Sequence, residues 1–236
     1  MMINPRHTLG TLVTTRPEFA TGFDRLGLDY CCGGQRTLAE AVAAAGLDLD
    51  DVIDVLEADS DGTSTGGWAH LGLAELVDHL EATHHAYLDE ALPRLSQLAA
   101  KVDDVHGERH PELAEVRRLV GALRADMEPH LRKEEQVLFP MIRQLAAATT
   151  PPTFHCGSLA DPISVMLREH DDVGDLLAAL RSAAGDFAVP DDGCASYRSL
   201  FAGLAELEAD THLHVHKENN LLFPAVAEAE RALADA

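Results

Sequence analysis

The stretch HLRKEEQVLFP begins at His130, and a second stretch, HVHKENNLLFP, begins 84 positions later at His214. Residues four apart on an α-helix lie on one face. His130 with Glu134, and His214 with Glu218, therefore each point an imidazole and a carboxylate the same way. In both copies an apolar Leu-Phe follows and anchors the turn in a core. One such pair is common by chance, but two in the same context predict a duplicated helical site.

Around the two motifs, apolar residues recur at helical spacing in four long stretches. The breaks between these stretches are polar or carry Pro and Gly, as helix ends do. The stretches are roughly 72–100, 111–147, 161–184 and 195–233. Four amphipathic helices with short or moderate connections predict an antiparallel four-helix bundle, so the fold class is all-α.

The first sixty residues have the pattern of shorter helices. The stretch TLAEAVAAAG has Thr37 as N-cap and Gly46 just past its end. The Gly/Ser/Thr stretch SDGTSTGGW that follows is typical of a linker. We therefore expect a small helical domain at 1–62 that precedes the bundle, a linker at 63–71 that lets this domain move, and the bundle at 72–236.

Charge and composition limit the partners. The net charge of −22, from 18 Lys and Arg against 40 Asp and Glu, repels phosphate backbones and anionic membranes, so we expect no nucleic-acid and no membrane partner. An apolar leader segment and a run of about 20 apolar residues are both lacking, which favours a cytoplasmic protein. Structural disulfides are not expected, because the adjacent Cys31 and Cys32 cannot easily reach unstrained disulfide geometry.

The duplication extends to two more histidines. His85 on the first long helix and His170 on the third stand 85 positions apart, which nearly matches the spacing of the two motifs. Buried together as bare ionisable groups, such side chains would each cost several kcal/mol, so they need a cation. Imidazole and carboxylate ligands suit iron, manganese or zinc, and two equivalent halves suit two metals bridged by the glutamates. The predicted ligands are His85, His130, Glu134, His170, His214 and Glu218.

Other residues have weaker claims on the site. His84 competes with its neighbour His85, and the repeat offset favours His85. Glu169 precedes His170 and is expected either to orient a ligand or to be an exposed helix cap. His79 lies on the helix of His85 and is a candidate to orient a ligand. The remaining histidines considered are expected to be surface residues or neighbours of ligands: His106, His110, His212 and His216.

Several stretches, in order along nearly the whole chain, resemble a known family. They are LGLDYCCGG followed by TLAEA, then LAELVDHL, HHAYLDEALPRL, HLRKEEQVLFPMI, DPISVMLREHDDVGDLL and HVHKENNLLFP. They resemble the Repair of Iron Centres family, which joins an N-terminal Cys-Cys module to a hemerythrin-like His-His-Glu domain. The resemblance implies a non-haem di-iron centre on the six ligands above, carboxylate-bridged and oxo-bridged when oxidised. It also implies restoration of iron-sulfur clusters damaged by nitric oxide or peroxide.

Three functions fit these features. The first is a repair protein that supplies iron to damaged iron-sulfur proteins, with Cys31 and Cys32 transferring iron. The second is an enzyme that reduces nitric oxide or peroxide, and the third is a sensor or carrier of O2 or NO. The cysteine pair favours repair, because a carrier needs no thiols. The sequence assigns no catalytic residue. It leaves open whether the chain is an enzyme, and also whether it forms a homodimer.

The remaining cysteine predictions concern reactivity. Cys31 and Cys32 precede two glycines and a predicted helix start, whose dipole would lower a thiol pKa. The alternative for this stretch is a tight turn with two small buried residues. Cys156 lies with His155 in a long connection at 149–161, which is either an added ligand or a surface loop. Cys156 and Cys194 are expected to be ordinary thiols.

Overall fold

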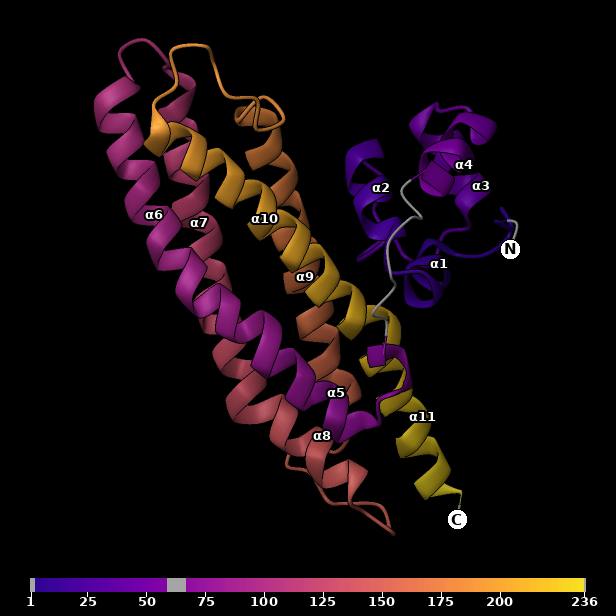
Figure 1. Cartoon of the computed structure of the whole chain (residues 1–236). Coiled ribbons are helices and arrows are strands. Elements are labelled where there is room, and N and C mark those ends of the chain that lie inside the picture. The colour runs from indigo at the N-terminus through magenta and orange to yellow at the C-terminus, as the bar shows by residue number, and fades with distance from the viewer. Residues whose placement is uncertain (1–2, 59–66, 236) are drawn as a thin grey trace. The chain divides into compact units, whose positions relative to one another are not determined.

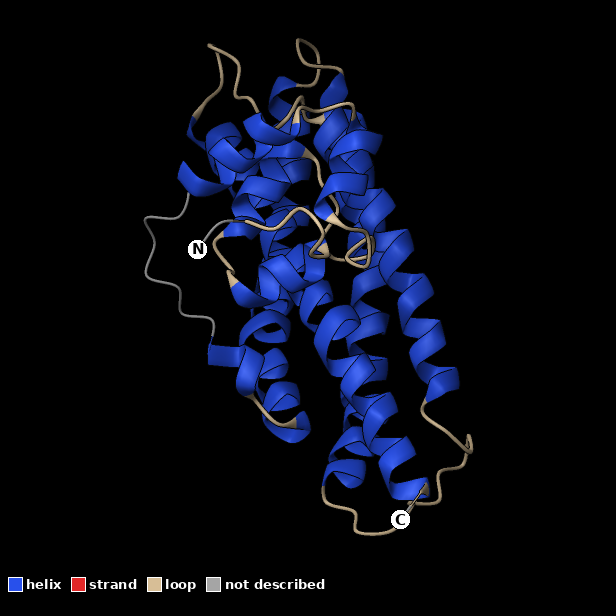
Figure 2. Cartoon of the chain, turned by 90° about the vertical axis from the view of Figure 1, so that its right-hand side faces the viewer, coloured by secondary structure: helices blue, strands red, loops and turns tan. Residues whose placement is uncertain are grey.

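The computed structural model describes residues 3–58 and 67–235 and is built of helices (Figure 2). Within these residues the β-structure is limited to two isolated bridges, Thr8 with Thr37 and Phe154 with Gly157. The predicted all-α class is confirmed. In this described part of the chain, no helix combines the length and apolar character needed to cross a bilayer.

Two compact units make up the fold. One contains residues 80–141 and 160–211, and the other contains residues 1–79, 142–159 and 212–236. We call the first the bundle unit and the second the terminal unit. Three of the four divisions fall within continuous runs of helix, so three of the predicted long helices contribute residues to both units, whereas the predicted helix at 161–184 lies in the bundle unit alone.

The bundle unit is formed by α6 (Ala86–His106), α7 (Glu112–Lys133), α9 (Ala160–Ala183) and most of α10 (Ala195–Lys217), which lie side by side in Figure 1. Apolar residues three and four apart form an inward stripe on each helix. The stripe of α6, for example, holds Leu88, Leu92 and Leu95. Together these stripes bury one core, which also includes Leu119, Leu123, Leu177, Leu180, Leu200, Leu204 and Leu207.

Three of the four predicted long helices contain a wide π turn. These turns are η3 (Glu81–His85), η4 (Glu134–Leu138) and η5 (Glu218–Leu222). In η4 and η5 the N–H of the following Phe bonds the carbonyl of the first Glu, five residues back. The next residue is Pro140 or Pro224, which has no N–H to continue the normal ladder. The Leu-Phe-Pro motif therefore accompanies a π turn, a feature often found at functional sites.

Beyond these turns, the helices continue into the terminal unit as α8 (Phe139–Ala146) and α11 (Phe223–Ala234), with α5 (Leu73–Leu80) before η3. The terminal unit also holds α1 (Leu9–Thr15), α2 (Phe19–Leu26), α3 (Leu38–Ala45) and α4 (Leu49–Ala58). Helix α3 has the predicted N-cap, with Thr37 in a capping box with Glu40, and Gly46 ends it in the left-handed conformation.

Helices α1 to α4 pack on the C-terminal part of the chain within the terminal unit. Leu213 packs against their core, and His212 Nδ1 lies 2.8 Å from Asp24 Oδ1. Asn220 approaches the backbone so closely that a Cβ at Gly34 would lie 2.5 Å from its Oδ1. These contacts describe one arrangement of the small domain, and its movement stays a prediction.

The predicted linker at 63–71 is described only from Gly67, because residues 59–66 lie outside the described part. Its second half forms a 3₁₀ turn, η2 (Gly67–His70), whose Trp68 is buried. The 149–161 connection is a turn held on α11, where Leu159 N donates to Glu230 Oε1 at 3.0 Å. Cys156 Sγ bonds the Ser158 carbonyl at 3.2 Å in the same turn.

Candidate metal centre

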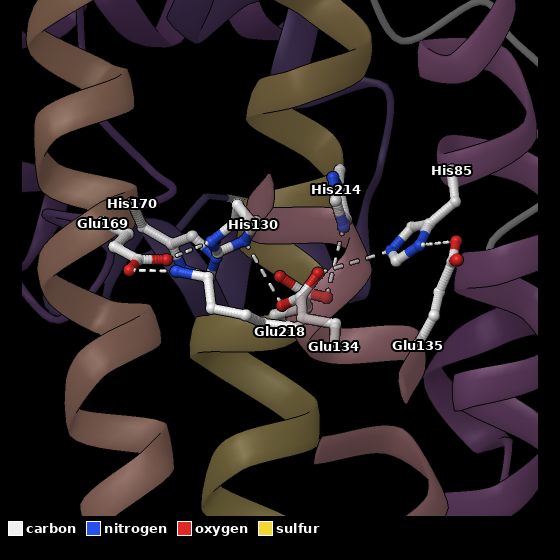
Figure 3. A network of polar contacts seen from close by, with 9 residues as sticks. His85, His130, Glu134, Glu135, Glu169, His170, His214 and Glu218 are labelled. Atoms are coloured by element: carbon white, nitrogen blue, oxygen red, sulfur yellow. Dashed lines mark hydrogen bonds and ion pairs between the residues drawn. The ribbon is translucent and has the colours of Figure 1, made fainter. Parts of the chain in front are cut away.

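The bundle unit brings four of the six predicted ligands together around Glu134 (Figure 3). His130 Nε2 lies 3.3 Å from Glu134 Oε1, and His85 Nε2 lies 3.5 Å from Glu134 Oε2. His170 Nε2 lies 3.1 Å from His130 Nε2. All four side chains are buried. The four residues come from η3, α7, η4 and α9, so only the packed bundle assembles them.

Two carboxylates orient two of these imidazoles. Glu169 Oε2 lies 2.8 Å from His130 Nδ1, and Glu135 Oε1 lies 2.9 Å from His85 Nδ1 (Figure 3). An ionised carboxylate can only accept, so Nδ1 donates in both pairs. Each ring then presents the lone pair of its Nε2 toward Glu134, as ligands of a metal do.

The surroundings of Glu169 favour its ionised form. Burial opposes its ionisation, but hydrogen bonds from Lys133 and His130 outweigh burial and hold the pKa of Glu169 below its ordinary value. The carboxylate is therefore charged at neutral pH, and the Nδ1–H of His130 is held toward it.

Around Glu134, acceptor nitrogens of two imidazoles face the acceptor oxygens of the carboxylate. The Nε2 lone pairs of His85 and His130 are directed at a carboxylate, and neither oxygen of Glu134 accepts a hydrogen bond from a described residue. A buried carboxylate without a donor is costly, and a cation removes that cost. Imidazole and carboxylate donors without thiolate fit iron. The residues present therefore fit a metal ion.

His214 and Glu218, in the terminal unit, repeat the arrangement of the first motif. Both are fully buried, and His214 Nε2 lies 3.2 Å from Glu218 Oε1. The corresponding distance between His130 and Glu134 is 3.3 Å. In each copy the glutamate begins a π turn and its carbonyl accepts the wide hydrogen bond.

Comparison with known proteins finds two domain families that match this chain. Residues 76–226 match the model of the hemerythrin HHE cation binding domain, and residues 5–60 match ScdA_N, a domain of unknown function (DUF542). The chain belongs to the hemerythrin HHE family. Its relatives include the iron-sulfur cluster repair proteins YtfE of Cronobacter sakazakii and Escherichia coli, each 34% identical over 94% of this chain and 97% of the relative. The resemblance found from the motifs is confirmed.

In this hemerythrin HHE chain, the adjacent histidines of η3 have separate partners. His85 faces Glu134 and Glu135, whereas His84 Nδ1 lies 2.8 Å from Asp210 Oδ1. The π turn separates the two rings, and the structure places His85, not His84, beside Glu134.

His79 lies in a different environment from the one expected. Its Nε2 is 2.9 Å from Lys217 Nζ, which is buried and stands 5.1 Å from the Trp68 ring. Burial, and then the charge of Lys217, lower the pKa of His79. The ring is therefore a neutral acceptor for this ammonium group.

The cysteine pair lies in a turn held by Asp29. Asp29 Oδ1 accepts from the N–H groups of Cys31 and Cys32 at 3.1 and 2.9 Å, and the two Sγ atoms are 3.8 Å apart. A hydrogen bond with Cys32, burial, and the negative charges of Cys32 and Asp29 raise the pKa of Cys31 well above its ordinary value. The expected lowering by a helix dipole is wrong for Cys31, because α3 begins only at Leu38.

Sequence reasoning missed three carboxylates of these sites. Glu135 directly follows a predicted ligand, and Asp29 stands two residues before Cys31. Both could have been found from the sequence, because each is an acidic residue next to or near a residue already predicted to belong to a site. Asp210, the partner of His84, had no local signal, since the two residues are 126 positions apart.

Proposed function

We propose that His85, His130, Glu134, His170, His214 and Glu218 hold two iron ions, with Glu134 and Glu218 as bridging ligands. The burial of all six side chains and the cation-fitting group around Glu134 support this proposal. So does the membership of the hemerythrin HHE cation-binding family. Iron bound in this way supplies exchangeable ferrous ions and redox chemistry.

The pattern of α10 supports the inclusion of His214 and Glu218. Leu204 and Leu207 belong to the bundle core, and Thr211 is buried one turn later. His214 and Glu218 continue this same face at helical spacing, because α10 is unbroken from Ala195 to Lys217. The inward face of this helix thus changes from apolar residues to ligand types at the second motif, and the face of α7 shows the same change of residue types at the first motif.

The function supported best is repair of iron-sulfur clusters damaged by nitrosative or oxidative stress, with iron as the cargo. The main observation behind this proposal is the buried histidine-carboxylate group, which fits iron. In addition, the chain is homologous over 94% of its length to proteins named for such repair. Damaged iron-sulfur proteins are the proposed partners. Nitric oxide, O2 and peroxide are proposed small ligands.

The cysteine turn is proposed to pass iron onward. Asn219 and Asn220, directly after Glu218, donate to the carbonyl of Cys31 at 3.3 and 3.0 Å. Asn220 also donates to the Tyr30 carbonyl at 3.4 Å. These bonds tie the thiol-bearing turn to the π turn that starts with a proposed ligand. Thiolates are the ligands of iron-sulfur clusters, so thiols in this position suit transfer.

The test is anaerobic incubation of the protein, loaded with labelled ferrous iron, with a [4Fe–4S] dehydratase inactivated by nitric oxide. We expect recovery of dehydratase activity together with labelled iron in the client. Glu134→Ala should lose both iron and repair, while the matched variant His84→Ala should keep both. Nitrous oxide release without iron transfer would instead support the nitric oxide reductase alternative.

A further inference from the structure

A cysteine-histidine pair lies in the bundle unit away from the proposed iron ligands. Cys194 directly precedes α10, and His106 is the last residue of α6. His85 directly precedes α6, whose 21 residues span about 30 Å at 1.5 Å per residue. The pair therefore stands at the opposite end of α6 from His85.

The two side chains are in direct contact. Cys194 is exposed, and its Sγ lies 3.2 Å from His106 Nε2. His106 itself is only 5% exposed. Within the described residues the thiol is the one hydrogen-bond partner of this imidazole, because its Nδ1 has none. A buried polar ring is thus directed at an exposed sulfur atom.

The start of α10 provides a second source of stabilisation for a thiolate. The N–H groups of Tyr197 and Ser196 point at Cys194 from the first turn of a 23-residue helix. The hydrogen bond from the Tyr197 backbone, followed by that from His106, lowers the pKa of Cys194 from 9.0 to about 7. Cys194 is therefore not the ordinary thiol that its sequence context predicted.

Tyr197 fixes the position of the imidazole. Its ring makes an edge contact with His106, with ring centroids 5.5 Å apart, and a similar contact with His110 at 5.6 Å. Tyr197 is fully buried in the bundle core. The buried Tyr197 ring therefore fixes the His106 imidazole in place, with its Nε2 toward the sulfur.

The acidic side chains around the pair have partners of their own. His110 contacts Asp192 Oδ1 at 2.9 Å and Glu112 Oε1 at 3.2 Å. Arg109 reaches the other oxygen of Asp192 at 3.1 Å. Arg198 donates to the Gly193 carbonyl beside Cys194. Because the two carboxylates have cationic or histidine partners, their charge opposes a thiolate less.

We propose that Cys194 is a nucleophilic thiolate site, activated by His106, that reacts with hydroperoxides. The thiolate attacks the terminal peroxide oxygen, so an S–O bond forms as the O–O bond breaks. Sulfur loses two electrons and becomes sulfenic acid, and the peroxide is reduced. The released hydroxide, or the alkoxide from an organic hydroperoxide, takes the proton that the thiol gave to His106 and leaves as water or an alcohol.

The first measurement is the alkylation rate of Cys194 by iodoacetamide across pH 5.5 to 10, followed by peptide mass spectrometry of the intact folded chain. At pH 7 a thiol with a pKa of about 7 is half ionised, against about 1% for the ordinary value of 9.0. The lower nucleophilicity of the more acidic thiolate reduces this advantage to about fivefold in rate.

His106→Gln keeps a hydrogen-bonding side chain but cannot carry the positive charge. We expect its rate profile to move toward higher pH, with alkylation about threefold slower at pH 7. The control His155→Gln changes an exposed histidine of the terminal unit and should keep the wild-type midpoint. Circular dichroism establishes that both variants are folded.

The second measurement traps sulfenic acid with dimedone after brief hydrogen peroxide treatment. Labelling should appear at Cys194 before Cys156 and should fall in His106→Gln. A wild-type midpoint near pH 9, or an unchanged profile in folded His106→Gln, would overturn the thiolate assignment. Alkylation as expected without a dimedone adduct at Cys194 would overturn hydroperoxide as the substrate.

Discussion

Replacing Glu169 by alanine should weaken iron binding through His130, which it contacts at 2.8 Å. Without the carboxylate, the His130 Nδ1–H loses the acceptor that holds it. The His130 Nε2 is then less basic and is no longer held toward the metal site. Loss of such a partner costs roughly 10- to 100-fold in metal affinity, or about 1.4 to 2.7 kcal/mol. The pKa of Glu169 lies below 4.5, so its contribution is complete at neutral pH and is lost only as pH falls through that lower value.

The structure places Glu169→Ala toward the upper part of that range. Glu169 also pairs with Lys133, and its removal leaves this ammonium uncompensated near the cation site. Glu135→Ala removes the corresponding partner of His85, but no lysine contact of Glu135 is present in the described part of the chain. We therefore expect about 30- to 100-fold for Glu169→Ala and about tenfold for Glu135→Ala.

The assay is anaerobic competition for ferrous iron against a coloured chelator at pH 7. The double variant Lys133→Ala, Glu169→Ala should recover part of the affinity lost in Glu169→Ala, because the unpaired charge is gone. Exposed Glu108 provides a control, since Glu108→Ala removes a similar charge away from the ligands. Equal iron affinity in wild type and Glu169→Ala would refute the orienting role. An effect as large in Glu108→Ala would show that only overall charge matters.

Three further predictions follow from other contacts. Asn220→Ala should slow iron delivery to a damaged cluster while leaving iron content unchanged, because Asn220 holds the Cys31 carbonyl but is no proposed ligand; equal delivery rates would contradict this. Cys31 should be alkylated at least about tenfold more slowly than Cys194 at pH 7.5, since its thiol is buried and its pKa is raised; mass spectrometry of the labelled peptides measures both rates in one sample. Arg181→Met should lower the free energy of unfolding by about 3 kcal/mol, because Arg181 pairs with Glu208, which is only 2% exposed; urea unfolding measures this, and the double variant Arg181→Met, Glu208→Leu should regain most of the loss.

The helices could be predicted closely because their signals are local. Apolar spacing and the positions of Pro and Gly gave stretches at 161–184 and 195–233, and the structure has helix at 160–183 and 195–234. The capping box at Thr37 lies within four residues of sequence. The i, i+4 relation of His130 and Glu134 likewise depends only on helix geometry.

The contacts that tune the side chains could not be predicted in this way. The π turns depend on how the helices pack as well as on Pro140 and Pro224, and η3 forms without such a proline. The lowered pKa of Cys194 needs His106, which is 88 positions away. The raised pKa of Cys31 follows from its burial, which its position before a helix did not indicate.

The amino-acid sequence by itself determined the helical class and the residue types available to bind a metal, because periodicity and ligand spacing act within a few turns of helix. The repeat offset already favoured His85 over His84, and the tertiary structure places His85 beside Glu134. Only the tertiary structure decided that Glu169 and Glu135 orient the imidazoles, and which thiol is acidic. These outcomes depend on distances between side chains 39 to 88 positions apart, which helix packing sets and no local pattern contains.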